Sequence, residues 1–281
     1  MKPNNMATTA LYKAIERHGG AQSPSILKHL SEAKIKDFSD LTRARVMDLR
    51  DELRESLAPS SAKTVAASLV ALLRRYEDEG IIPCKDYGTV LRLKGEAPVK
   101  TYLNESELER LERVKTKNQN EAVVLNEFII GTKTGARLSD IRELDETNVV
   151  NGTLTYTSKK TGITASVPCS EKTIARLRWL QANGKDVDVS TFNRTIQRLC
   201  KRAGITDEVK VHKAGKDMTG PKWMFISSHS ARISVATNLA DNGTPLTDIR
   251  DILGHTGTAM TSRYVCRREV KLNEKSLALF Q

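Results

Sequence analysis

The spacing of apolar residues predicts that the first third of the chain is helical. Apolar positions recur every three or four residues, and little of this part alternates as a strand does. The expected helices cover residues 8–17, 24–31, 40–57 and 60–79. In the last of these, Val65, Leu69, Leu72, Leu73 and Tyr76 share one face and are expected to pack inward. We therefore expect a small helical domain at this end of the chain.

The rest of the chain predicts further helices around one β-rich stretch. Helical patterns cover residues 104–114, 121–132, 140–144, 170–182, 190–203 and 270–279, and two more flank Asn242-Gly243. Ser139 is the expected N-cap of the 140–144 helix. Between residues 148 and 168, Asn151-Gly152 and Lys160-Thr161-Gly162 mark turns beside short alternating segments. The expected fold is mainly α with a small antiparallel β-sheet in the C-terminal domain, and residues 206–226 form a loop or hairpin of undefined position.

Composition separates the chain into two domains and suggests a polyanionic partner. Glycine and proline punctuate residues 80–98, so we expect domains at 1–97 and 98–281. The formal net charge is +11, which favours nucleic acid, although an ordinary basic surface remains an alternative. No long apolar run or N-terminal signal pattern indicates a membrane or secretion. The four cysteines and five histidines show no metal-ligand spacing, so we expect a cytoplasmic protein without a metal.

A group of reactive side chains lies near the C-terminal end. His229 and Arg232 are three positions apart, so a helix would present both on one face. His255 follows Leu253-Gly254 at an expected turn, and Tyr264 comes nine residues later. Arg137 follows Thr134-Gly135, where a tight turn between two helices would hold it as a phosphate clamp. A single histidine or tyrosine is most often structural, but two histidines, two arginines and a tyrosine together indicate a site.

These residues resemble the signature of the tyrosine recombinase (phage integrase) family. The resemblance covers residues 100–281 and rests on Arg137, on His229 and Arg232 in an H-x-x-R pattern, on His255 after Leu-Gly, and on Tyr264. It implies a helical core-binding domain and a mixed α+β catalytic domain, with Asp140 supporting the site. It also implies a catalytic lysine before Thr-Gly on the β-hairpin. We choose Lys160, with Lys159 as the alternative.

The resemblance further implies a partner and an assembly. A two-domain, Xer-like or Cre-like enzyme would bind double-stranded DNA at a recombination site, as a monomer off DNA and a homo-tetramer on paired sites. The C-terminal helix would dock on a neighbouring protomer, and an accessory DNA-bending or directionality factor is possible. No cofactor is expected. Candidate DNA contacts, each of which could instead be a solvated charge, are Arg43, Arg50, Arg54, Lys63, Arg74, Arg194, Arg198 and Lys201.

Several functions remain open at this point. Integration or excision of a mobile element is the favoured role, and chromosome or plasmid dimer resolution would use the same chemistry. A topoisomerase-like strand transferase would religate the same strand. A non-catalytic helix-turn-helix protein could account for residues 244–264, but it would leave Arg137, Lys160 and His229 without a role.

Overall fold

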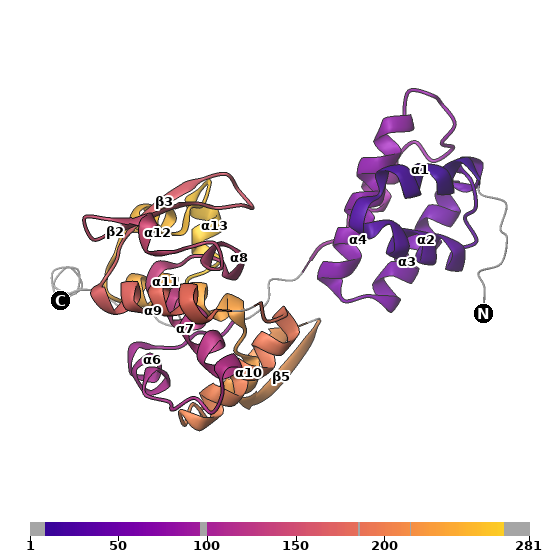
Figure 1. The fold of residues 1–281 in the computed structure, drawn as a ribbon. Helices are drawn as coiled ribbons and strands as arrows, with labels where there is room; N and C mark the ends of the chain where they lie inside the picture. Colours follow the sequence, from indigo (N-terminus) through magenta and orange to yellow (C-terminus); the bar gives the residue numbers. More distant parts are fainter. Residues whose placement is uncertain (1–8, 96–99, 185, 214, 267–281) are drawn as a thin grey trace, which may run out of the picture. The chain divides into compact units, whose positions relative to one another are not determined.

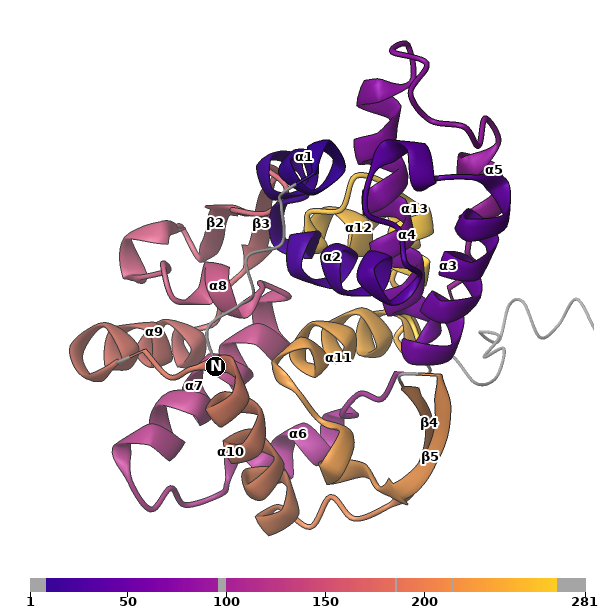
Figure 2. The same ribbon diagram turned by 90° about the vertical axis from the view of Figure 1, so that its right-hand side faces the viewer.

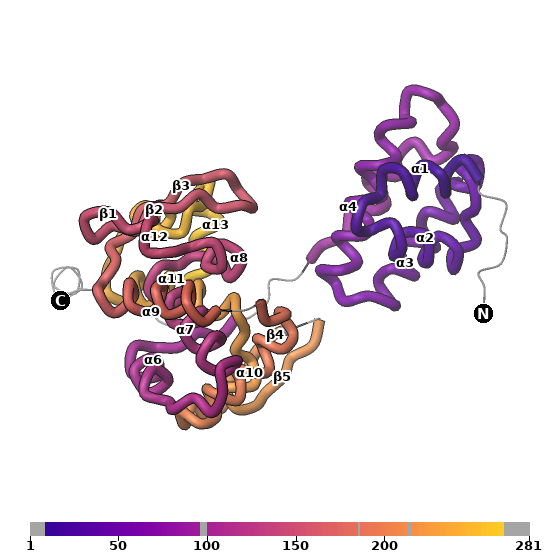
Figure 3. Tube along the Cα trace, in the orientation of Figure 1, coloured from indigo at the N-terminus to yellow at the C-terminus, as the bar shows by residue number. Residues whose placement is uncertain are grey.

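The computed structural model describes residues 9–95, 100–184, 186–213 and 215–266. The chain divides into two compact units. The first consists of Met1–Pro98 with His212–Asp217, and the second of Val99–Val211 with Met218–Gln281. Figure 1 shows the chain coloured along its sequence, and Figure 3 traces the same view as a tube.

The first unit is a helical bundle around one apolar core. Its helices are α1 (Ala10–His18), α2 (Ser23–Glu32), α3 (Arg43–Ser56), α4 (Pro59–Leu73) and α5 (Tyr87–Val90). Short 3₁₀ turns lie at Gly20–Gln22, Phe38–Asp40 and Arg74–Tyr76. Leu49, Leu53, Leu69 and Leu73 are all buried in the core, so the predicted helical periodicity matches the packing.

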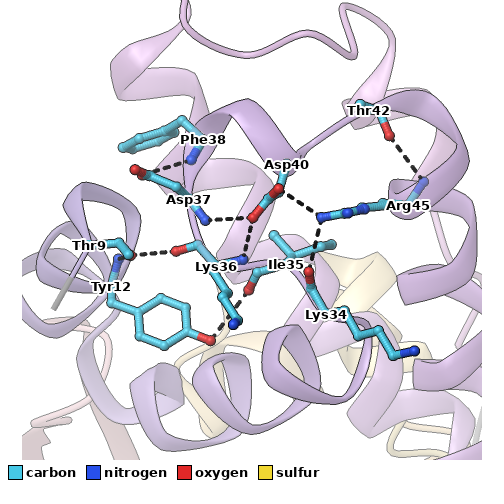
Figure 4. A network of polar contacts seen from close by, with 10 residues as sticks. All are labelled: Thr9, Tyr12, Lys34, Ile35, Lys36, Asp37, Phe38, Asp40, Thr42 and Arg45. Atoms are coloured by element: carbon cyan, nitrogen blue, oxygen red, sulfur yellow. Dashed lines mark hydrogen bonds and ion pairs between the residues drawn. The ribbon is translucent and has the colours of Figure 1, made fainter. Parts of the chain in front are cut away.

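Polar contacts fix the turn between α2 and α3 (Figure 4). Asp40 accepts hydrogen bonds from the backbone nitrogens of Lys36 (2.8 Å) and Asp37 (3.1 Å). Arg45 on α3 donates to the Asp40 carboxylate at 2.7 Å and to the carbonyl of Lys34 at 3.0 Å. These bonds hold the pKa of Asp40 below its usual value, mainly through the backbone of Lys36. The Asp40 carboxylate is therefore bound both by the backbone of the turn and by Arg45.

The second unit is built around two helices that lie side by side in its middle. These are α7 (Gln119–Thr134) and α11 (Ser228–Asp241), with a β-hairpin at one end of the unit and α6 and α10 at the other (Figures 1 and 2). The remaining helices are α6 (Glu105–Glu112), α8 (Leu138–Ile141), α9 (Glu171–Asn183), α10 (Val189–Arg202), α12 (Leu246–Leu253) and α13 (Thr258–Ser262). Short 3₁₀ turns lie at Glu146–Asn148 and Lys222–Phe225.

The main sheet of the second unit is antiparallel with the order β1-β2-β3. Its strands are β1 (Val149–Val150), β2 (Thr153–Thr157) and β3 (Thr164–Pro168), and Tyr156 pairs with Ala165. Asn151 and Gly152 both have positive φ, as a two-residue hairpin turn requires. β3 packs against α12, which places the tip of the β2–β3 hairpin near the segment that carries His255.

The fold class predicted from the sequence is confirmed. Some local predictions were wrong, because short capping turns end helices that the apolar periodicity would continue. The expected helix 40–57 begins at Arg43 after a separate 3₁₀ turn, and the expected helix 60–79 ends at Leu73. Ser139 is not an N-cap: it lies inside α8, whose N-cap position is Arg137.

The sequence did not define the position of residues 206–226, and it predicted a helix at 270–279. Residues 206–226 form a hairpin of β4 (Glu208–Lys213) and β5 (Lys216–Pro221), followed by the 3₁₀ turn at Lys222–Phe225. The expected helix at 270–279 lies outside the described residues.

Candidate active site

Arg232 is a fully buried cation at the centre of the candidate site. Its side chain projects from α11 and is 1 % exposed. One guanidinium nitrogen donates to the carbonyl of Gly135 at 2.5 Å, and the other terminal nitrogen donates to the carbonyl of Leu253. Burial lowers the pKa of Arg232, and the charge of Arg137 adds to this effect. A buried guanidinium that is held by carbonyls keeps its full charge, which is costly for stability and typical of a functional site.

Gly135 makes this arrangement possible. It ends α7 in the left-handed conformation, with φ of 72°. A Cβ atom there would lie 2.7 Å from a methyl carbon of Leu253, so a larger residue would displace the chain at the point where Arg232 is bound. The same turn brings Arg137 to the start of α8.

Arg137 is held on its other side by the β-hairpin. Its guanidinium donates to the Ser158 hydroxyl at 2.7 Å and lies 3.9 Å from the carboxylate of Asp140. Ser158 in turn donates to Asp140 at 3.0 Å, and the backbone nitrogen of Lys159 donates to the same carboxylate at 3.1 Å. Buried Asp140 therefore connects the arginine to the end of β2.

The hairpin separates the two candidate lysines. Lys160 lines a cavity together with Arg137, Arg232 and Tyr264. Lys159 instead forms an ion pair with Glu143 at 2.9 Å, where both side chains are exposed. The geometry favours Lys160 as the residue that can reach a substrate in the cavity.

Tyr264 lies among the other candidate residues. Its ring centroid is 5.1 Å from that of His229 and 4.8 Å from that of His255. The guanidinium carbon of Arg232 lies 5.6 Å from the ring centroid, and the ammonium nitrogen of Lys100 lies 4.4 Å from it. The turn after α12, closed by Gly254 in the left-handed conformation, places His255 beside α13, where its Nδ1 contacts the Thr261 hydroxyl at 3.1 Å. Five of the six predicted catalytic residues, Arg137, Lys160, His229, Arg232 and Tyr264, line one cavity, and His255 lies against the ring of Tyr264.

Both histidines are shifted towards their neutral form. The pKa of His229 falls to about 4, because the surrounding protein desolvates the imidazolium and Lys100 and Arg232 repel it. His229 is nevertheless exposed at the protein surface. The pKa of buried His255 also falls to about 4, through desolvation and then the charges of Arg232 and Arg137. At neutral pH each ring can therefore accept a proton or a hydrogen bond.

The cavity has a volume of about 650 Å³ and is strongly cationic. Among the described residues, its lining contains no carboxylate, and its basic side chains are Lys100, Arg137, Arg142, Lys160, Arg232 and Arg263. Three buried atoms around it have no hydrogen-bond partner within the described part of the chain: Nε of Arg232, Nε2 of His255 and the Thr161 hydroxyl. Buried polar groups in proteins nearly always have partners, so this arrangement suits an anion with several oxygen atoms.

The predicted DNA contacts of the first unit line two cavities there. Arg43, Arg50 and Arg54 line one of about 890 Å³, together with Arg92 and Lys94. Lys63 and Arg74 line a second, of about 540 Å³, with Lys85 and Arg92. Acidic residues reduce the charge available there, since Arg43 pairs with Asp86 and Arg50 with Asp51.

The predicted contacts of the second unit lie on α10. Arg194, Arg198 and Lys201 are all exposed there. Arg202, which follows them, instead pairs with Glu121 at 2.8 Å. The basic face of α10 therefore consists of the three predicted residues.

One group in the first unit has the composition of a metal site. His29, Glu32 and Glu52 place their ligand atoms within 4.8 Å of one another. Nδ1 of His29 lies 2.9 Å from the Glu52 carboxylate, a distance typical of a hydrogen bond. The sequence spacing gave no indication of this group.

The sequence interpretation missed two residues of the site. Neither Lys100 nor Ser158 was among the candidate residues. Neither belongs to a spaced motif, and only the fold brings Lys100 to Tyr264 and Ser158 to Arg137.

Residues 101–269 match the model of the phage integrase family. This match covers more than half of the 281 residues, so the chain belongs to the phage integrase family of tyrosine recombinases. No curated protein matches the chain. No described helix is long and apolar enough to cross a membrane.

Solved structures of low sequence identity share the fold. A lambda integrase dimer bound to a COC′ core site is 17% identical, with a TM-score of 0.67, and the match covers 94% of this chain and 96% of that one. The Tn1549 transposon integrase in complex with a circular intermediate DNA is 16% identical, with a TM-score of 0.68 and coverage of 96% and 97%. The XerH site-specific recombinase bound to a palindromic difH substrate is 15% identical, with a TM-score of 0.65 and coverage of 94% and 78%.

Proposed function

We propose that the protein is a site-specific DNA recombinase that cuts and rejoins strands through a 3′-phosphotyrosyl intermediate, and that it integrates or excises a mobile element. The observation that carries the proposal is the position of Tyr264, whose ring contacts those of His229 and His255 and over which Arg232 is placed. Membership of the phage integrase family supports the same chemistry.

Charge neutralisation is the first task of such a site. As the phosphorus of a phosphodiester becomes five-coordinate, negative charge builds on its nonbridging oxygens. Arg137 and Arg232 are both fixed by hydrogen bonds to the protein, so their planar guanidinium groups can bind those oxygens with little reorganisation. His255, whose Nε2 has no partner within the described chain, donates a hydrogen bond to one of these oxygens.

Proton transfer is the second task. Tyrosine ionises near pH 10 as a free side chain, so attack by Tyr264 requires a base, and His229 is neutral at pH 7 because of its low pKa. The departing 5′ oxygen needs a proton, which Lys160 supplies. The Tyr264 oxygen then forms a bond to phosphorus while the bond to the 5′ oxygen breaks. Attack by a 5′-hydroxyl from a second duplex reverses these steps and exchanges the strands.

DNA binding and assembly complete the proposal. The helical unit at residues 1–97 would bind DNA through the basic side chains of its two cavities, and the catalytic unit at 98–281 would add the basic face of α10. The lambda structure is a DNA-bound dimer, and another lambda integrase structure is a tetramer on a Holliday junction. By analogy, this chain would form a tetramer on paired sites.

Trapping of a covalent protein–DNA complex tests the chemistry. DNA attached to the protein in cells is sequenced, and the recovered site is built into a nicked oligonucleotide that loses its 5′-hydroxyl fragment after cleavage. Wild-type protein should accumulate a covalent adduct at a 3′ phosphate, whereas Tyr264→Phe should bind the same DNA and form none. An adduct at wild-type level with Tyr264→Phe would remove Tyr264 from the nucleophile role.

The recovered sequence also separates the two biological roles. A site at the ends of a mobile element supports integration or excision, and a site in a chromosomal or plasmid resolution locus supports dimer resolution. Relaxation of a supercoiled plasmid without exchange between paired sites would instead indicate a topoisomerase-like enzyme.

A further inference from the structure

Lys100 contacts the proposed nucleophile. Its ammonium nitrogen lies 4.4 Å from the centroid of the Tyr264 ring, within the range of a cation–π interaction. The same nitrogen donates to the carbonyl of Arg263 at 3.1 Å. Lys100 is half-buried and lines the cationic cavity, so its charge is directed at the residue before the nucleophile and at the nucleophile itself.

The backbone after Lys100 is fixed on α11. The backbone nitrogen of Leu103 donates to the Ser234 hydroxyl at 2.9 Å, and the Asn238 side chain donates to the carbonyl of Leu103 at 3.1 Å. Leu103 itself is fully buried. The helix that carries His229 and Arg232 therefore also positions the segment that carries Lys100.

On the basis of the proposed function, we propose that Lys100 is a further positioning residue of the active site, whose cation holds the ring of Tyr264 in place for attack on the scissile phosphate. His229 and Arg232 face the ring from α11, and His255 faces it from the turn between α12 and α13. All three of these residues follow residue 228 in the chain. Lys100 contacts the ring from the beginning of the second unit, so it adds a contact from a separate segment of the chain.

The charge of Lys100 has a second effect that can be measured without DNA. After desolvation, Lys100 is the largest cause of the low pKa of His229, ahead of Arg232, Arg137 and Lys160. Desolvation also lowers the pKa of Lys100 itself, and Arg263 adds to this while Cys266 opposes it. A Lys100 that lay in solvent would have little influence on His229. Removal of the charge should therefore raise the pKa of His229 towards 6.5.

The test compares Lys100→Met, Lys100→Arg and a matched control, Lys172→Met, in the full chain. Lys172 is an exposed lysine on α9 that does not line the cavity. Single-turnover adduct formation on the nicked site should be about tenfold slower for Lys100→Met, with DNA affinity within about twofold of wild type. Arginine also stacks on aromatic rings, so Lys100→Arg should retain most of the rate, and Lys172→Met should match wild type in both measurements.

Proton NMR titration of the histidines in the free protein provides the second readout, with His229→Gln identifying the His229 signal. The pKa of His229 should rise in Lys100→Met and stay low in Lys100→Arg. Equal rates and an unchanged His229 titration in Lys100→Met would overturn the proposal. A loss of affinity that accounts for the whole loss of rate would make Lys100 a DNA contact and also overturn it. If wild-type protein forms no adduct, the proposed function itself fails, and this is decided before any variant is compared.

Discussion

Two clusters of charged groups in this chain differ in how their charges are balanced. In the turn between α2 and α3, Asp40 and Arg45 neutralise each other, and backbone nitrogens bind the carboxylate (Figure 4). In the cavity of the second unit, six basic side chains and His229 line the space, and the described lining contains no carboxylate. The first cluster is organised for stability of the fold. The second keeps several cations around one cavity at a cost in stability: Asp140 pairs with Arg137 and Glu127 with Arg142, and a bound phosphate would neutralise others.

Replacement of one arginine in each cluster should give the largest contrast. Arg232→Met keeps most of the side-chain volume, and it should lower the rate of adduct formation by about 10³-fold, as for removal of an essential group that stabilises the transition state. Its melting temperature should change little, because the desolvation cost of the buried charge disappears while the carbonyls of Gly135 and Leu253 lose this donor. Arg45→Met should instead lose about 0.5–1 kcal/mol of stability and cleave normally.

Calorimetry and single-turnover assays on the same preparations measure both quantities. If Arg232→Met loses more stability than Arg45→Met, the buried arginine is a structural residue and the contrast does not hold.

Lys159 and Lys160, which are adjacent on the β2–β3 hairpin, allow a cation in an ion pair and a cation that lines the cavity to be compared directly. Lys160→Met should slow cleavage by about 10²-fold, because the 5′ oxygen then leaves without a proton. Lys159→Met, which removes only the exposed pair with Glu143, should stay within about twofold of wild type.

A substrate with sulfur in place of the bridging 5′ oxygen isolates the proton transfer. Thiolate leaves without protonation, so this substrate should restore the rate of Lys160→Met. If it restores Lys159→Met instead, the assignment of the two lysines is reversed.

The pH dependence of stability should give the smallest effect. His255 is neutral in the folded protein down to about pH 4 but is protonated below about pH 6.5 when unfolded. The unfolded state therefore binds more protons as the pH falls from 6.5 to 4, and the wild-type protein should lose on the order of 1–2 kcal/mol between pH 7 and pH 5 through this residue.

The carboxyl of Asp40 has the opposite behaviour. Its pKa is lowered, so its contribution is complete above about pH 4 and is lost only below that value. Denaturant unfolding at pH 7 and pH 5 should show that His255→Gln weakens the pH dependence and that Asp40→Asn leaves it unchanged. Equal slopes for His255→Gln and wild type would contradict the low pKa of His255.

The sequence predicted the helical architecture because apolar residues recur every three or four positions along each helix. Val65, Leu69, Leu72 and Leu73 are buried as their periodicity indicated. Local spacing also identified His229 with Arg232, and the turns that hold Arg137 and His255. It failed where two segments distant in the chain meet. Lys100 contacts Tyr264, and Ser158 contacts Arg137 and Asp140, through tertiary packing. No pattern in the residues next to Lys100 or Ser158 indicates these contacts.

Helix ends were also poorly predicted, because they depend on a few hydrogen bonds rather than on periodicity. Asp37 and Asp40 form a capping box that interrupts the expected helix 40–57. α8 begins directly after Arg137, so Ser139 has no capping role.

Thr237 ties the backbone around Tyr264 to α11. Its hydroxyl donates to the carbonyl of Tyr264 at 3.2 Å and accepts from the backbone nitrogen of Cys266 at 3.1 Å. The position of the tyrosine is therefore set from the same helix that carries His229 and Arg232, and not by the length of the chain between them. We therefore expect a change in the length of the turn between α11 and α12 to leave the tyrosine beside the arginine.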